Sequence, residues 1–214
     1  MSHEDLRKAL KRAASALKAD GPPFALAGSY ALWVHGAPEP HHDVDFVVAE
    51  EDVEAAAATL SKAGFDIRRP PEEWLFKAAV SVDGPALVDV LHRINRVPVD
   101  ASLIENASIE DVLALAIPVL SPTEILTQKL RALHEHHCDY ATLLPLVRAV
   151  REQLEACRCA AARAPDARAE RAGAEHRLSP GGAAAPGAGL SSRSLAFARR
   201  WSSMGVRLFS TGRS

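Results

Sequence analysis

Two aspartates one residue apart, Asp43 and Asp45, are the residues whose type and spacing point most directly to chemistry. Successive side chains of a strand point to opposite faces, so these two carboxylates would share one face, about 7 Å apart. Val44 and Phe46 would then point into a core. Neighbouring carboxylates repel each other unless a cation lies between them, and Mg²⁺ takes carboxylate and phosphate oxygens as ligands. The pair therefore predicts half of a metal–phosphate site.

A third aspartate, Asp89, interrupts an apolar run that is otherwise typical of a buried strand, Ala86-Leu-Val-Asp-Val-Leu91. A lone charge in such a strand is costly unless it is paired or coordinates a metal. In one interpretation Asp89 caps a turn or pairs with Arg93. The interpretation that we favour places it beside Asp43 and Asp45 on the neighbouring strand, as a third metal ligand or as a base.

A glycine–serine pair, Gly28-Ser29, stands where a short apolar strand meets a helix, with 13 residues between it and Asp43. Glycine lets the backbone approach a phosphate closely, and the N–H groups that open a helix attract anions. The Ser29 hydroxyl is able to donate to a phosphate oxygen. Alone, the pair would suit an ordinary strand-to-helix turn, but the acidic pair that follows favours a phosphate-binding role.

Taken together, these three motifs resemble the nucleotidyltransferase superfamily of the DNA polymerase β type. The similarity covers roughly residues 20–150, and the small bacterial members, antibiotic-modifying or toxin–antitoxin-like, are the nearest likeness. The resemblance implies an α/β fold with a polymerase-β-like core, in which a mixed sheet is flanked by helices and followed by a short helical part.

The resemblance also implies a reaction and its metal ions. A nucleoside monophosphate would pass from an NTP such as ATP to an acceptor hydroxyl, with release of pyrophosphate. Two Mg²⁺ ions would be held by Asp43, Asp45 and Asp89, and would stabilise the attacking and leaving oxygens. Asp89 would serve as the general base.

Lys129 is the further nucleotide-binding residue that the resemblance implies, together with Gly28 and Ser29. Its segment, Pro122-Thr-Glu-Ile-Leu-Thr-Gln-Lys129, is similar to the family's helix after the sheet, where a lysine reaches the triphosphate. The alternative is a lysine on a solvated helix face.

The acceptor stays open between a small molecule, a protein and an RNA end. A second hypothesis is an antitoxin-like binding module that keeps the fold and docks on a toxin partner. The presence of all three aspartates favours the enzyme.

The elements that must position these residues follow from periodicity and from turn residues. The apolar pattern predicts strands at 24–27, 43–49, 65–69, 74–82 and 86–92, the last two joined as a hairpin by Asp83-Gly84-Pro85. It predicts helices at 4–19, 29–35, 50–63, 109–116, 122–136 and 139–154.

Composition divides the chain into an α/β core at 1–107, a helical appendage at 108–154 and a tail at 155–214. Residues 1–154 carry 15 Lys and Arg against 23 Asp and Glu, a net charge of −8, whereas the tail carries 10 against 4, a net charge of +6. The tail is rich in Arg, Ala, Gly and Pro and lacks apolar periodicity. It is interpreted either as a disordered basic tail or as out-of-frame translation of a GC-rich gene.

Three cysteines do not make a disulfide framework, and no apolar run reaches the roughly 18 residues of a membrane span. The N-terminus is polar and acidic, unlike a signal peptide. These features predict a cytoplasmic protein without membrane contact.

Overall fold

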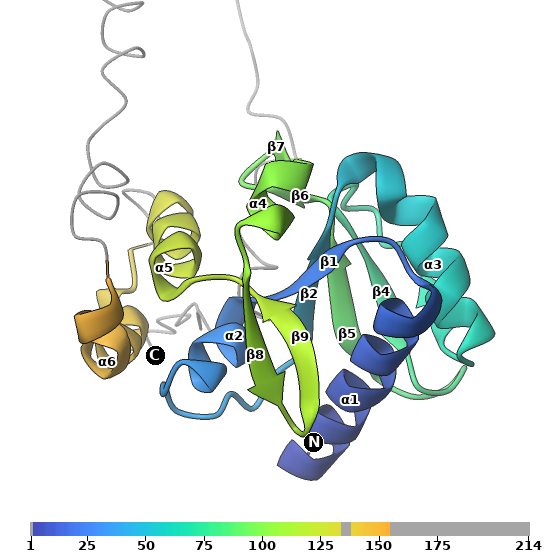
Figure 1. Ribbon diagram of the computed structural model, residues 1–214, viewed down its shortest axis with the longest axis horizontal. Helices are drawn as coiled ribbons and strands as arrows, with labels where there is room; N and C mark the ends of the chain where they lie inside the picture. The colour runs from blue at the N-terminus through green and yellow to red at the C-terminus, as the bar shows by residue number, and fades with distance from the viewer. Residues whose placement is uncertain (1, 134–137, 155–214) are drawn as a thin grey trace, which may run out of the picture.

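A seven-stranded mixed sheet forms the centre of the computed structural model, which describes residues 2–133 and 138–154 (Figure 1). The strand order is β3-β4-β5-β2-β1-β9-β8. The β2–β5 and β1–β9 pairs are parallel, and the other pairs are antiparallel. The strands are β1 (Phe24–Ala27), β2 (Val44–Val48), β3 (Asp66–Arg68), β4 (Leu75–Ala79), β5 (Ala86–Leu91), β8 (Ser108–Val112) and β9 (Leu115–Val119).

Helices pack around this sheet. Helix α1 contacts α3 and strands β2, β5 and β9, whereas α2 packs against β1, β2 and α5. The helices are α1 (His3–Asp20), α2 (Gly28–Val34), α3 (Val53–Lys62), α4 (Ala101–Glu105), α5 (Pro122–Arg131) and α6 (Tyr140–Val150). Shorter elements are the 3₁₀ turns η1 (Glu50–Asp52) and η2 (Arg151–Gln153) and the hairpin of β6 (Arg93–Ile94) and β7 (Val97–Pro98).

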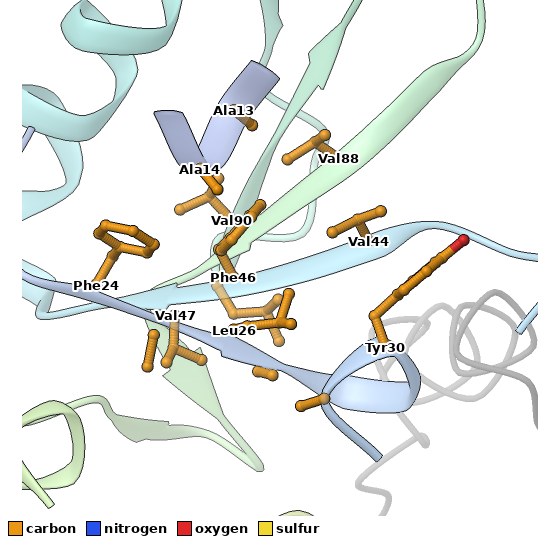
Figure 2. Packing of buried hydrophobic residues seen from close by; sticks show 14 of the residues in the cluster. Ala13, Ala14, Phe24, Leu26, Tyr30, Val44, Phe46, Val47, Val88 and Val90 are labelled. Atoms are coloured by element: carbon orange, nitrogen blue, oxygen red, sulfur yellow. The ribbon is translucent and has the colours of Figure 1, made fainter. Parts of the chain in front are cut away.

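Helix α1 shows how the sequence sets an element. Ser2 caps it by accepting a hydrogen bond from the Asp5 amide, and the Asp5 carboxylate accepts from Ser2 in return, which is a capping box. Six of its apolar residues recur at helical spacing and are buried, and Gly21 ends the helix. Figure 2 shows Ala13 and Ala14 of this helix beside Val90 and Phe46 of the sheet.

Because side chains alternate along a strand, the residues between these core positions face away from α1. Phe46 and Val90 occupy matching positions of β2 and β5, and so do Asp45 and Asp89. The fold therefore places the two aspartates on the face of the sheet opposite α1.

The expected helix at 109–116 is wrong. This segment forms the β8–β9 hairpin, and β9 pairs in parallel with β1 through Leu26 and Val119. The turn lies at Leu113 and Ala114, which both have positive φ, 53° and 63°. These residues lack the glycine or asparagine that usually marks such a turn, so the local sequence favours a helix. Burial of Ile117 and Val119 in the core outweighs that preference.

The other expected elements within the described residues are confirmed, with ends that differ by a few residues. The sheet extends to Val119, so β8 and β9 join the strands of the expected core. The domain boundary at residue 107 stays a prediction. The tail at 155–214, and the helical prediction for 134–137, lie outside the described residues.

No helix among the described residues is both long enough and apolar enough to cross a bilayer.

Candidate active site

Neighbouring strands place two aspartates and a lysine in one line across the sheet. Asp45 of β2 stands opposite Asp89 of β5, and Lys77 of β4 stands opposite Asp89 on its other side. Side chains at matching positions of neighbouring strands point to the same face, so these three share a face. Asp43 directly precedes β2. We refer to Asp43, Asp45 and Asp89 as the acid cluster.

The acid cluster is buried, and its three carboxylates interact electrostatically. Asp43 is 8% exposed, and Asp45 and Asp89 are each 2% exposed. Burial raises the pKa of Asp45 well above its usual value, and the charges of Asp43 and Asp89 raise it further. Burial and the Asp43 carboxylate likewise raise the pKa of Asp89 to about 7, although Lys77 opposes the shift. The three carboxylates therefore share one electrostatic environment of low polarity.

Gly28 lies against this cluster and has no room for a side chain. It opens α2 with φ at +59°, a left-handed conformation that side-chain-bearing residues rarely adopt. A Cβ atom there would lie 1.9 Å from Asp45 Oδ2, far inside van der Waals contact. The glycine is therefore required by the close approach of the Asp45 carboxylate.

Ser29 and Lys129, 100 residues apart, also meet beside the cluster. Helix α5 packs on α2, and Lys129 Nζ donates to Ser29 Oγ over 3.4 Å. Lys129 is 5% exposed, which contradicts the alternative of a solvated helix-face lysine. Burial lowers the pKa of Lys129, while the charges of Asp45 and Asp43 act to raise it. The nucleotide-binding residues predicted from the sequence thus lie together, and their roles stay predictions.

Lys77 was missed by the reasoning from sequence. Its ammonium forms an ion pair with both oxygens of Asp89 and lies 3.7 Å from Asp43 Oδ2. One signal was present, because Leu75-Phe-Lys-Ala-Ala79 is an apolar strand interrupted by a single charge, as in the run around Asp89. Applied to both strands of the hairpin, the same argument predicts a pair.

The alternative in which Asp89 pairs with Arg93 is wrong. Arg93 Nε donates to Glu50 Oε1 over 2.6 Å instead. Arg93 begins β6, beyond the end of β5, whereas the hairpin puts Lys77 directly opposite Asp89.

The donor chemistry of the acid cluster fits a hard divalent cation, since carboxylate oxygens are the ligands that Mg²⁺ takes. Asp45 Oδ1 is buried and accepts no hydrogen bond, so it is available to a cation. Yet no three His, Cys, Asp or Glu side chains of the described residues are arranged to hold an ion as they stand. Lys77 engages Asp89 and approaches Asp43. The residues fit a metal, provided that Lys77 gives way.

No protein-family model and no curated protein matches the sequence. Solved structures do match. The antibiotic-resistance factor ANT(2'')-Ia, determined in solution, aligns with a TM-score of 0.55 and 16% identity, over 82% of this chain and 98% of that protein. The same factor crystallised with adenylyl-2''-tobramycin aligns with a TM-score of 0.47 and 16% identity, over 82% and 99%.

A nucleotidyltransferase-like protein from Paracoccidioides brasiliensis also aligns, with a TM-score of 0.47 and 16% identity, over 72% of this chain and 77% of that one. At this identity the likeness to ANT(2'')-Ia concerns the fold. The chain therefore has a polymerase-β-like nucleotidyltransferase fold, with a mixed sheet flanked by helices, and this part of the sequence prediction is confirmed.

Proposed function

We propose that this protein transfers a nucleoside monophosphate from an NTP to an acceptor hydroxyl in a metal-dependent reaction. The observation that carries the proposal is the convergence of three buried carboxylates beside Gly28, Ser29 and Lys129, on a nucleotidyltransferase fold. Lys77 supplies one positive charge to three buried carboxylates, so their placing beside a second buried lysine and a hydroxyl favours a site for a metal and a triphosphate.

Two Mg²⁺ ions, one held by Asp43 and Asp45 and the other by all three aspartates, would supply Lewis-acid stabilisation of charge on the phosphates. Lys129 offers a buried ammonium to the triphosphate, and its present partner, the Ser29 hydroxyl, offers a donor to the same anion. The absence of a Cβ at Gly28 leaves room for the Asp45 carboxylate against the start of α2.

Asp89 is suited to take the proton of the acceptor hydroxyl, because its carboxylate lies in the acid cluster beside Asp45. The acceptor oxygen forms a bond to the α-phosphorus, its proton passes to the Asp89 carboxylate, and the bond from the α-phosphorus to the bridging oxygen breaks. Pyrophosphate leaves with the electrons of that bond, and the products are a nucleotidylated acceptor and pyrophosphate.

The test is the binding of each of the four NTPs with Mg²⁺, measured by calorimetry for the full chain and for Asp45→Asn. The variant keeps the shape of the side chain and removes its charge, so we expect NTP affinity to fall at least about tenfold. Asp111→Asn is the matched control, because Asp111 is an exposed acid of β8. Equal Mg–NTP binding by the wild-type protein and Asp45→Asn would show that the site is wrongly assigned.

The acceptor class remains a small molecule, a protein or an RNA end, and transfer of α-phosphate label from the preferred NTP to each class distinguishes them. The toxin-docking alternative stays a prediction. The Asp45→Asn variant separates the two hypotheses, since docking on a partner protein does not require the buried carboxylates to hold a metal–nucleotide complex.

A further inference from the structure

Lys77 takes the place of a cation within the acid cluster. Its ammonium pairs with Asp89 and approaches Asp43, and the side chains of these two aspartates are only 3% and 9% exposed. A buried carboxylate needs a compensating charge, and Lys77 supplies one from a neighbouring strand. The acid cluster is therefore partly neutralised by the chain itself.

The same ammonium stands in the way of a metal ion. A divalent cation that takes oxygens from Asp43 and Asp89 would lie beside the Lys77 ammonium, and like charges at such short range repel strongly in a buried site. Lysine is suited to move aside, because its charge sits on a flexible four-carbon stem. The Lys77 side chain is 15% exposed, so part of it already contacts solvent.

We propose that Lys77 is a resident counter-cation, which holds Asp43 and Asp89 together in the metal-free protein and must leave them before a divalent cation binds. It thereby weakens the binding of free metal and makes metal binding depend on the nucleotide, whose negative charge compensates for the additional cation. This proposal rests on the proposed function, since it takes the acid cluster to be the metal site. Lys77 is a positioning residue in this scheme, because it acts through Asp43 and Asp89.

The first experiment measures the binding of Mn²⁺ without nucleotide by electron paramagnetic resonance. We expect Lys77→Met, which keeps the length of the stem and removes the charge, to bind Mn²⁺ at least about tenfold more tightly than the wild-type protein. Lys77→Arg, which retains a positive charge, should not tighten binding. Lys62→Met is the matched control, because Lys62 is an exposed lysine of α3 and the substitution makes the same change in net charge.

The same titration in the presence of a non-hydrolysable NTP analogue tests the dependence on nucleotide. The nucleotide should increase Mn²⁺ affinity more in the wild-type protein than in Lys77→Met. If Mn²⁺ binds, Asp45→Asn abolishes that binding and Lys77→Met leaves it unchanged or weaker, the role of Lys77 is refuted and the proposed function stands. If no variant binds Mn²⁺ with or without nucleotide, both proposals are refuted.

A second measurement uses the wild-type protein and so does not depend on the folding of a variant. The rate of reductive methylation of each lysine is followed by mass spectrometry, with and without saturating Mn²⁺. Release of the ammonium from Asp89 should increase the rate at Lys77 and leave the rate at Lys62 unchanged. A Lys77 rate that stays constant while Mn²⁺ binds would overturn the proposal.

Discussion

Lys77 and Lys129 approach the same acid cluster from different parts of the molecule. Lys77 comes from a strand, pairs with Asp89 and keeps part of its side chain at the surface. Lys129 comes from α5, donates to Ser29 and is almost completely buried. The strand lysine neutralises carboxylates that the proposed metal needs, whereas the helix lysine lies beside the residues proposed to hold the phosphates. The two cations are therefore expected to affect metal and nucleotide binding in opposite directions.

The largest effect, on the free energy of unfolding, is expected at Gly28, which adjoins the Lys129 partner Ser29. Gly28→Ala forces a side chain into a left-handed backbone and into the Asp45 carboxylate, so we expect a loss of about 3 kcal/mol in the free energy of unfolding. Urea denaturation measures it. Gly36→Ala is the matched control, because Gly36 also has positive φ, +104°, but nothing lies within 4 Å of its Cβ position. Equal losses in both variants would show that the close approach to Asp45 contributes nothing.

The comparison of the two lysines is tested most directly by nucleotide affinity. Lys129→Met removes a buried charge from the proposed phosphate side and should weaken Mg–NTP binding by about 2 kcal/mol, roughly 30-fold. Lys77→Met should not weaken it, since Lys77 competes with the metal. Calorimetric titration of both variants with the preferred NTP gives the two dissociation constants. A similar loss of affinity in both would abolish the distinction between the two lysines.

The smallest expected effect is a change of the free energy of unfolding with pH, caused by Asp89, the partner of Lys77. The folded pKa of Asp89 is about 7, above its unfolded value of 3.8, so the stabilising contribution is complete below about pH 4 and is lost as pH rises through 7. In the metal-free protein, the free energy of unfolding should fall by about 1 kcal/mol from this group between pH 6 and pH 7. Urea denaturation in EDTA at both pH values measures the change.

Asp89→Asn should reduce this pH dependence, because asparagine does not titrate, and Asp111→Asn should leave it unchanged. The same dependence in Asp89→Asn as in the wild-type protein would place the titrating group elsewhere. Deprotonation of Asp89 lowers the free energy of unfolding, although it also strengthens the attraction between Asp89 and Lys77.

Much of the candidate site could be predicted because its residues stand out locally. Asp43 and Asp45 follow a fixed spacing, and Asp89 interrupts an apolar strand. The parallel register of β2 and β5 then sets Asp45 against Asp89. The prediction needed the two strands to be neighbours in a register that puts both carboxylates on one face, since a strand holds alternate side chains on one face.

Lys77 was harder to place because its partner depends on the register of a hairpin. At the turn end of the hairpin Ala79 pairs with Ala86, and this register, continued without irregularity, would set Lys77 opposite Val88. A register shift between Ala78 and Ala79 moves its partner to Asp89. A one-residue change in register exchanges the faces of the side chains, so a local irregularity decides the contact.

The β8–β9 hairpin was missed for a different reason. Its turn residues, Leu113 and Ala114, favour helices and carry no turn signal, and only pairing with β1 and burial against the core select the strand conformation.

By itself, the sequence determined the kinds of group available to the site and the spacing of Asp43 and Asp45. Covalent spacing along one strand or turn is sufficient for each of these. Only the tertiary structure decided that Lys129 meets Ser29 and that Lys77 pairs with Asp89. Those contacts join segments far apart in the chain or depend on strand register, and both are selected by burial of the whole core.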